Sequence, residues 1–144
     1  MVNLEWCKKQ IRGIELIQRK EHLSRSYLDE AHESFEAFLK NEGKWKVVIG
    51  YYACYNSLYS ILMKCGIKSE IHDCSINLMG LFDFSLEEIE FMKDLKKKRI
   101  DTQYYLKEVG QVSLEKVKKF ILKCESILSE LNEDKIRSVR EKLK

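Results

Sequence analysis

The segment Lys44–Lys64, with the sequence KWKVVIGYYACYNSLYSILMK, decides the fold of this chain. Its apolar residues recur three and four positions apart, which is the spacing of an α-helix. They occupy nearly every side of that helix, so we expect it to lie centrally or to share a face with a partner chain. At 1.5 Å per residue the helix is about 30 Å long. Gly66 is expected to end it.

The flanking sequence reads as further helices. We expect a first helix over residues 4–17 behind an Asn3 N-cap, weakened by Gly13, and a polar connector over 19–25. Ser26 is expected to open the next helix. Further helices are predicted from starting signals and apolar stripes, and they cover residues 26–39, a short stretch near 72–79, 86–100, 114–131 and one or two turns at 136–143.

Composition supports an all-α fold. The 144 residues contain no proline, where average usage predicts about seven, and only six glycines. We expect one antiparallel bundle of five to six helices with a four-helix up-and-down core. The whole chain, 1–144, is expected to be a single domain. Within it we assign a core at 26–131, an additional N-terminal helix at 1–20 and a C-terminal helical extension at 132–144.

Charge and hydropathy exclude some classes of protein. The net charge of +3 comes from 26 basic and 23 acidic side chains, which is too balanced to indicate a nucleic-acid binder by itself. No stretch approaches the uninterrupted apolar length of a membrane span, so no membrane partner is expected. Residues 1–10 lack the apolar core of a signal peptide. These features predict a cytoplasmic protein.

The five cysteines are odd in number and contain no C-x-x-C pair. In a reducing compartment such cysteines are usually free thiols. We therefore expect no disulfide framework. The cysteines are Cys7, Cys54, Cys65, Cys74 and Cys124.

Metal and cofactor chemistry have little support. The pair Asp29-x-x-His32 resembles half of a di-iron motif but stands alone. Cys65, His72 and Cys74 do not have a recognised zinc spacing. No glycine-rich phosphate loop is present. We expect neither a metal nor a cofactor. The tyrosines of the central helix, Tyr52, Tyr55 and Tyr59, are interpreted as core rather than as a ligand platform.

The charge order singles out one cluster. Residues 69–92 carry only acids, and residues 93–99 are mostly basic, which suits the dipole of a helix. Arg99, however, falls on or beside the apolar stripe of that helix, and an inward arginine is costly unless it is paired. Asp101, Gln103, Tyr104 and Tyr105 follow directly. We take this cluster as the candidate site.

Three motifs in order resemble the HEPN family (higher eukaryotes and prokaryotes nucleotide-binding). They are Trp45 followed by Tyr51-Tyr52-Ala53-Cys54-Tyr55, the turn Gly66-Ile67-Lys68-Ser69-Glu70-Ile71-His72, and Arg99-Ile100-Asp101-Thr102-Gln103-Tyr104-Tyr105. The resemblance covers residues 27–131. It implies an antiparallel helical bundle that forms a homodimer, with a cleft at the dimer interface lined by the arginine motif of both chains.

The resemblance also bears on catalysis. Ribonuclease members of the family place a histidine four to six residues after the arginine, where this chain has Tyr104, Tyr105 or Leu106. Other relatives end in Arg-x-x-x-Asp-Tyr; here Gln103 replaces the aspartate and Tyr104 keeps the tyrosine. A tyrosine with a pKa near 10 is a poor general base at neutral pH. We therefore expect a protein without this ribonuclease activity; if it is an enzyme, Arg99 and Tyr104 are the catalytic candidates.

Three hypotheses follow. The first is a HEPN-type dimer that binds a nucleotide or RNA phosphate without cleaving it, as the partner of a small nucleotidyltransferase-domain protein in a toxin–antitoxin-like pair. The second is a metal-independent endoribonuclease that uses Tyr104 or His72. The third is a protein-interaction module without nucleotide binding, in which Arg99 pairs with Asp101 or Asp73. The candidate ligand-binding residues are Arg99, Asp101, Gln103, Tyr104, Tyr105, Lys96 and His72.

Overall fold

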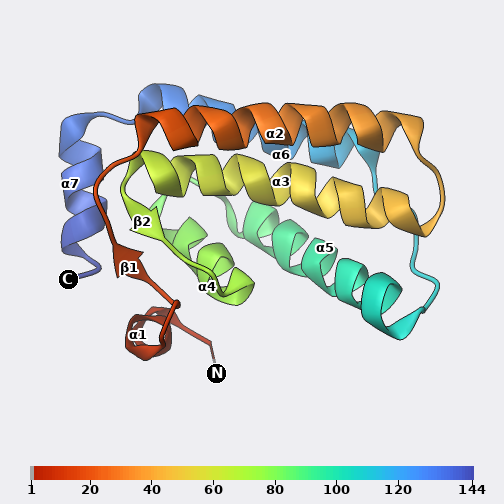
Figure 1. Cartoon of the computed structure of the whole chain (residues 1–144), viewed down its shortest axis with the longest axis horizontal. Helices are drawn as coiled ribbons and strands as arrows, with labels where there is room; N and C mark the ends of the chain where they lie inside the picture. Colours follow the sequence, from red (N-terminus) through yellow and green to blue (C-terminus); the bar gives the residue numbers. More distant parts are fainter. Residues whose placement is uncertain (1) are drawn as a thin grey trace.

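The computed structural model describes residues 2–144, and it is an all-α bundle, as predicted (Figure 1). Four long helices form the body of the bundle: α2 (Glu21–Lys40), α3 (Lys44–Lys64), α5 (Leu86–Tyr105) and α6 (Leu114–Glu130). The shorter elements are α1 (Leu4–Lys9), α4 (His72–Asn77), a 3-10 turn at Leu78–Leu81, α7 (Glu133–Glu141), and the two strands β1 (Glu15–Leu16) and β2 (Ile67–Lys68). Residues 2–144 contain seven α-helices, against the five to six predicted, because α1, α4 and α7 are each a separate short helix.

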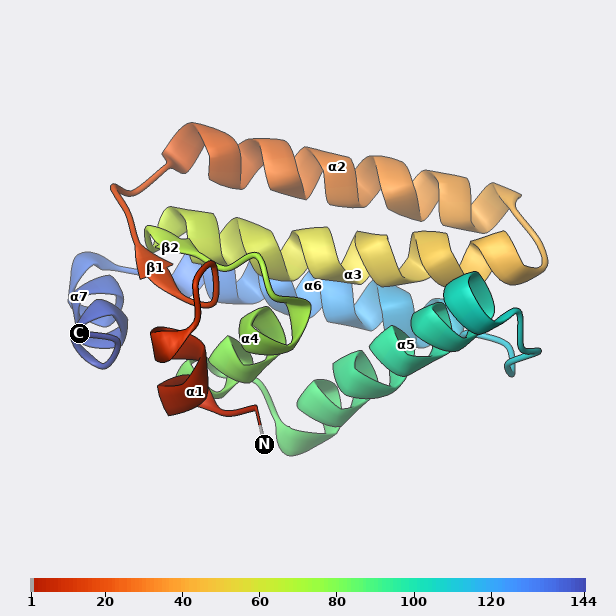
Figure 2. The ribbon, with the colours of Figure 1, turned by 60° about the horizontal axis from the view of Figure 1, so that its bottom comes forward.

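Helix α3 is the centre of the bundle, and it has the bounds that its sequence predicts. Helix α2 runs along one side of it, and α5 and α6 pack against its other sides (Figures 1 and 2). Gly50 lets α2 approach closely, because a Cβ atom there would lie 2.9 Å from the ring of Phe38. The helix that is apolar on nearly every side is therefore the one that touches every other layer.

The N-terminal segment differs from the prediction. Helix α1 ends at Lys9, and the chain then turns and pairs as β1 with β2 in an antiparallel ladder. Arg12 takes a left-handed conformation, with a φ of 68°. At Gly13 a Cβ atom would collide with the carbonyl oxygen of Cys7. The prediction of a helix over 4–17 is thus wrong beyond Lys9. A turn that requires glycine and the pairing of β1 with β2 determine the structure there, although the local apolar spacing is helical.

Helix α2 starts earlier than predicted. It begins at Glu21, so residues 21–25 are helix rather than connector. The hydroxyl of Ser26 donates to the carbonyl of His22 at 3.1 Å and caps nothing. Ser24 is buried, and its hydroxyl donates to the carbonyl of Ser60 on α3 at 2.7 Å. This contact with α3 favours one more turn of helix.

Helices α1, α5, α6 and α7 each begin directly after a residue whose side chain caps the first turn. Asn3 accepts from the N–H of Trp6 at 2.8 Å. Ser85 and Glu88 form the predicted capping box, with distances of 3.1 and 2.7 Å. Ser113 caps α6. Asn132 lies in the short connection after α6, and its side chain caps α7.

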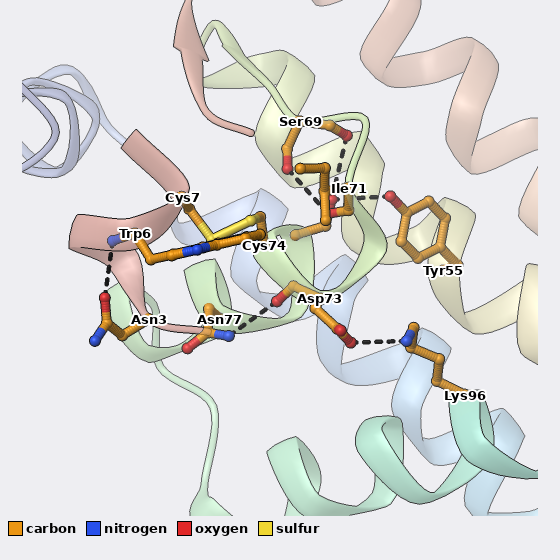
Figure 3. Close-up of a disulfide and its surroundings, with 11 residues drawn as sticks. Asn3, Trp6, Cys7, Tyr55, Ser69, Ile71, Asp73, Cys74, Asn77 and Lys96 are labelled. Atoms are coloured by element: carbon orange, nitrogen blue, oxygen red, sulfur yellow. Dashed lines mark hydrogen bonds and ion pairs between the residues drawn. A yellow bond between two sulfur atoms is a disulfide. The ribbon is translucent and has the colours of Figure 1, made fainter. Parts of the chain in front are cut away.

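Two of the cysteines form a disulfide, which corrects the expectation of five free thiols. Cys7 on α1 is bonded to Cys74 on α4, with their Cα atoms 5.7 Å apart (Figure 3). The residues are 67 positions apart in the sequence, so spacing could not reveal the pair. Cys54, Cys65 and Cys124 are free and buried.

Helix α7 crosses the end of the bundle near the C-terminus of α3 (Figure 1). Arg140 on α7 lies 2.9 Å from three carbonyl oxygens, those of Ile17, Cys65 and Gly66. One guanidinium thus ties the C-terminal extension to β1 and to the turn after α3. Within residues 2–144 no helix is both long enough and apolar enough to cross a membrane.

Candidate functional site

Arg99 is a buried cation without a carboxylate partner. Only 7% of its surface is exposed, and no acidic side chain among residues 2–144 lies within ion-pairing distance of it. Nη1 donates to the hydroxyl of Tyr52 at 3.2 Å and lies 3.5 Å from the side-chain oxygen of Gln103. Nε is buried and has no hydrogen-bond partner in the described chain. Buried charges are normally paired, so this site has unused capacity for an anion.

Aromatic rings surround the guanidinium. Its carbon lies 4.7 Å from the ring centre of Tyr51, 5.6 Å from that of Tyr52 and 5.9 Å from that of Tyr104. These distances suit cation–π attraction, which offsets part of the cost of burying the charge. Tyr51 and Tyr52 come from α3 and Tyr104 from the end of α5. The contact between α3 and α5 therefore builds the site.

His72 joins the same cluster from α4. Its Nδ1 lies 2.7 Å from the hydroxyl of Tyr51, and its ring stacks on Tyr55 with the ring centres 4.1 Å apart. Burial, with a smaller contribution from the charges of Arg99 and Lys96, lowers the pKa of His72 to about 4. The imidazole is therefore neutral at pH 7. Burial also raises the pKa of Tyr51 far above its usual value, so its phenol stays protonated.

The acidic residues near Arg99 form ion pairs with lysines. Asp73 on α4 lies 2.8 Å from Nζ of Lys96 on α5 (Figure 3). Asp101 lies 3.6 Å from Nζ of Lys97. The pairing that the third hypothesis requires, Arg99 with Asp101 or with Asp73, is thus absent from the described residues. The Asp73–Lys96 pair instead joins the helix that carries His72 to the helix that carries Arg99.

The structure brings together only part of the predicted set. Gln103 and Tyr104 lie beside Arg99, and His72 reaches it through Tyr51. Lys96 lies at the edge, in its pair with Asp73. Asp101 and Tyr105 do not join the cluster, because Asp101 faces Lys97 and the ring of Tyr105 lies near Lys107.

Sequence reasoning missed two residues of the site. Tyr51 and Tyr52 both contact the guanidinium, although Tyr52 was interpreted as core and Tyr51 was not among the candidate site residues. Tyr51 is fully buried, so it is part of the core and also contacts Arg99. A signal was present: adjacent tyrosines in a helix point in directions about 100° apart, so one of them leaves the stripe to which the other belongs.

The described chain offers no metal site. Among residues 2–144 no three histidine, cysteine, aspartate or glutamate side chains gather so that they could hold an ion. Cys74 is bonded to Cys7 and so is no ligand beside His72.

Comparison of the chain with protein-family models, with curated proteins and with solved structures gives no match. The HEPN resemblance therefore rests on the three sequence motifs alone.

Proposed function

We propose that this chain is a HEPN-type protein that binds the phosphate group of a nucleotide or of RNA at Arg99 without cleaving it. The observation that carries the proposal is the buried guanidinium with no carboxylate partner. Leaving such a charge uncompensated costs several kcal/mol. A phosphate supplies the missing charge and accepts from the guanidinium in the planar, bidentate geometry that arginine favours.

The rings support a nucleotide rather than a simple anion. Tyr104 lies beside the guanidinium and keeps 64% of its surface exposed. An exposed aromatic ring next to a phosphate-binding cation is a platform on which a base can stack. Gln103 adds a side-chain amide within reach of Arg99.

The test is a titration with adenosine 5′-monophosphate and with a short single-stranded RNA. We compare the natural chain with Arg99→Met and with Arg25→Met, which removes an exposed arginine from α2. We expect Arg99→Met to weaken both ligands at least tenfold and Arg25→Met to leave them within about twofold. Equal affinities for all three proteins would refute the site.

Pairing of chains belongs to the same proposal. The HEPN resemblance implies a homodimer whose arginine motifs line a shared cleft, and a nucleotidyltransferase-domain protein as a further partner. In support, Tyr104, Tyr105 and Leu106 are exposed at the C-terminal end of α5, and Tyr104 lies beside Arg99. Light scattering should give twice the mass of one chain. A monomer over the whole concentration range would refute the dimer.

A second candidate function is metal-independent RNA cleavage, and the placement of His72 favours it. When Nδ1–H donates to the oxygen of Tyr51, Nε2 of the neutral imidazole keeps its lone pair. Such a nitrogen could take the proton of a ribose 2′-hydroxyl as that oxygen attacks the phosphorus. The P–O5′ bond then breaks, and the 5′-oxygen leaves as a hydroxyl with a proton returned by the imidazolium or by water. Arg99 would hold the phosphate. The low pKa of His72, about 4, makes it a weak base, so the non-catalytic function remains our first proposal.

Incubation of a labelled RNA with the purified chain decides between the two functions. Cleavage that ends in a 2′,3′-cyclic phosphate, and that both His72→Gln and Arg99→Met abolish, would establish the ribonuclease. Cleavage that persists in both variants belongs to a contaminant. With no cleavage at all, the binding function stands alone.

A further inference from the structure

A cavity of about 860 Å³ lies beyond the Arg99 cluster. It is formed where the turn between α2 and α3 meets the loop that follows α5. Gly43, Lys44 and Lys46 line it from the start of α3, Thr102 from α5 and Lys107 from the loop. Arg99 does not line it, but Thr102 lies one turn further along the same helix. Nothing in the proposed function uses this cavity.

The charge of the cavity suits a singly charged anion. Lys44, Lys46 and Lys107 have no carboxylate within ion-pairing distance among residues 2–144; the ammonium group of Lys46, for example, lies over the ring of Phe38. Two acids, Glu42 and Glu108, also line the cavity, so the positive excess is one charge. A phosphodiester, with one negative charge, matches this excess better than a free triphosphate.

The start of α3 adds backbone donors. This helix is 21 residues long, and its N-cap, Gly43, supplies no side chain to bond the first N–H groups. Gly43 has a φ of 76°, and a Cβ atom built there would meet nothing within 4 Å. The N–H groups of Lys44 and Trp45 have no acceptor in the described chain. Such an uncapped N-terminus favours an anion through its free donors and its dipole.

A buried hydroxyl provides the independent observation. Thr102 is 1% exposed, and its hydroxyl has no hydrogen-bond partner among residues 2–144. Buried hydroxyls are normally bonded, and an unbonded one costs about 1–3 kcal/mol. Thr102 is one of the residues that line the cavity, so a ligand oxygen that reaches the hydroxyl there gives it the partner that the free chain lacks.

We propose that this cavity binds a second phosphodiester of a single-stranded RNA whose neighbouring phosphate is held at Arg99. The inference rests on the proposed function and extends it from one phosphate to a strand. Arg99 and Thr102 lie about 4.5 Å apart along α5. Arg99 contacts α3 through Tyr52, and Thr102 lines the cavity at the start of α3, so the two sites lie along the same pair of helices. The lysines, the start of α3 and the Thr102 hydroxyl hold the second phosphate, while Arg99 and Tyr104 hold the first nucleotide.

The experiment compares a hexanucleotide RNA with adenosine 5′-monophosphate, which occupies the Arg99 site alone. In the variant Lys46→Gln/Lys107→Gln we expect the hexanucleotide to bind about tenfold more weakly at low salt. The dependence of log affinity on log salt should fall by about 0.7, the value for one phosphate of a single strand. The affinity for the mononucleotide should stay within about twofold.

The matched control is Lys135→Gln/Lys142→Gln, which removes the same charge from α7 and its C-cap at the far end of the bundle (Figure 1). If it weakens the hexanucleotide as much, the effect is one of net charge, and the proposal is wrong. The proposal also fails if the Lys46/Lys107 variant binds the hexanucleotide normally or loses mononucleotide affinity equally. A failure of the proposed function can be told apart from a failure of this proposal. In that case Arg99→Met binds both the mononucleotide and the hexanucleotide as well as the natural chain does.

Thr102→Val provides a second test that does not change charge. Because the hydroxyl is unbonded in the free protein, its loss should leave the melting temperature unchanged or higher. If the hydroxyl donates to the bound strand, the affinity for the hexanucleotide should fall several-fold, while the mononucleotide binds as before. If Thr102→Val binds the hexanucleotide with full affinity, the Thr102 hydroxyl does not contact the bound strand, and that part of the proposal is wrong.

Discussion

At the scale of single residues, Arg99 is a buried charge that the folded protein compensates only in part, through aromatic rings and neutral hydrogen-bond partners. We predict that Arg99→Met leaves the free energy of unfolding within about 1 kcal/mol of the natural value, or raises it, because the variant no longer buries an unpaired charge. Leu95→Ala, one turn earlier on α5 and also buried, should cost about 3 kcal/mol through lost packing. Urea unfolding of both variants measures the contrast. A loss at Arg99 as large as that at Leu95 would mean that the arginine is structural.

His72 makes stability depend on pH. Its pKa is about 4 in the folded chain against 6.5 when unperturbed, so the unfolded chain binds more protons between these values. The contribution of the neutral imidazole is complete above about pH 6.5 and is lost as the pH falls towards 4. We predict a steeper loss of melting temperature over this window for the natural chain than for His72→Gln. His22→Gln, at an exposed position on α2, should keep the natural slope. If both variants keep it, His72 does not titrate as described.

The candidate site could be predicted only in part from the sequence. Arg99 was identifiable because it interrupts an apolar stripe, and Gln103 and Tyr104 follow within one or two turns. The roles of Tyr51 and His72 depend on how α3, α4 and α5 pack, and a one-dimensional pattern does not contain that information. For the same reason the partners of the nearby acids were not predictable.

At the scale of elements, the pair α2 and α3 depends on Gly50. An alanine there would place its Cβ 2.9 Å from the ring of Phe38, which is fully buried and has little room to move. We predict that Gly50→Ala costs about 1–3 kcal/mol, although alanine is the better helix former. Gly80→Ala, where a Cβ meets nothing within 4 Å, is the control. The double variant Gly50→Ala/Phe38→Leu should recover part of the stability that Gly50→Ala loses. If it recovers none, the contact between position 50 and Phe38 is not the cause of that loss.

The elements differ in how well the sequence predicts them, for a physical reason. Helix α3 is fixed by its own composition and by glycines at both ends, and its predicted bounds hold. The starts of α5 and α6 are fixed by serine caps within three residues, which is local information. Strand β1 forms only because β2, some fifty residues later, pairs with it, and local spacing cannot report such a contact.

At the scale of the whole molecule, the disulfide joins the N-terminal segment to the middle of the chain. Cys7 and Cys74 close a loop 67 residues long between α1 and α4, and both are fully buried. A cross-link over such a loop restricts the unfolded chain and stabilises the fold by about 4 kcal/mol. We predict that a reducing agent lowers the free energy of unfolding of the natural chain by about this amount.

The variant Cys7→Ser/Cys74→Ser separates loss of the cross-link from other effects of the reductant. It should match the reduced natural chain in urea unfolding and should not respond to reductant, because the remaining cysteines, Cys54, Cys65 and Cys124, are free already. Helix α1 has only six residues, too few to persist without tertiary contacts. Without the cross-link, the amides of α1 should therefore lose their protection from hydrogen exchange before those of α3 do. If reduction changes neither stability nor the exchange of α1, the ladder of β1 and β2 and the Arg140 contacts already hold the N-terminal segment, and the cross-link adds nothing to the fold.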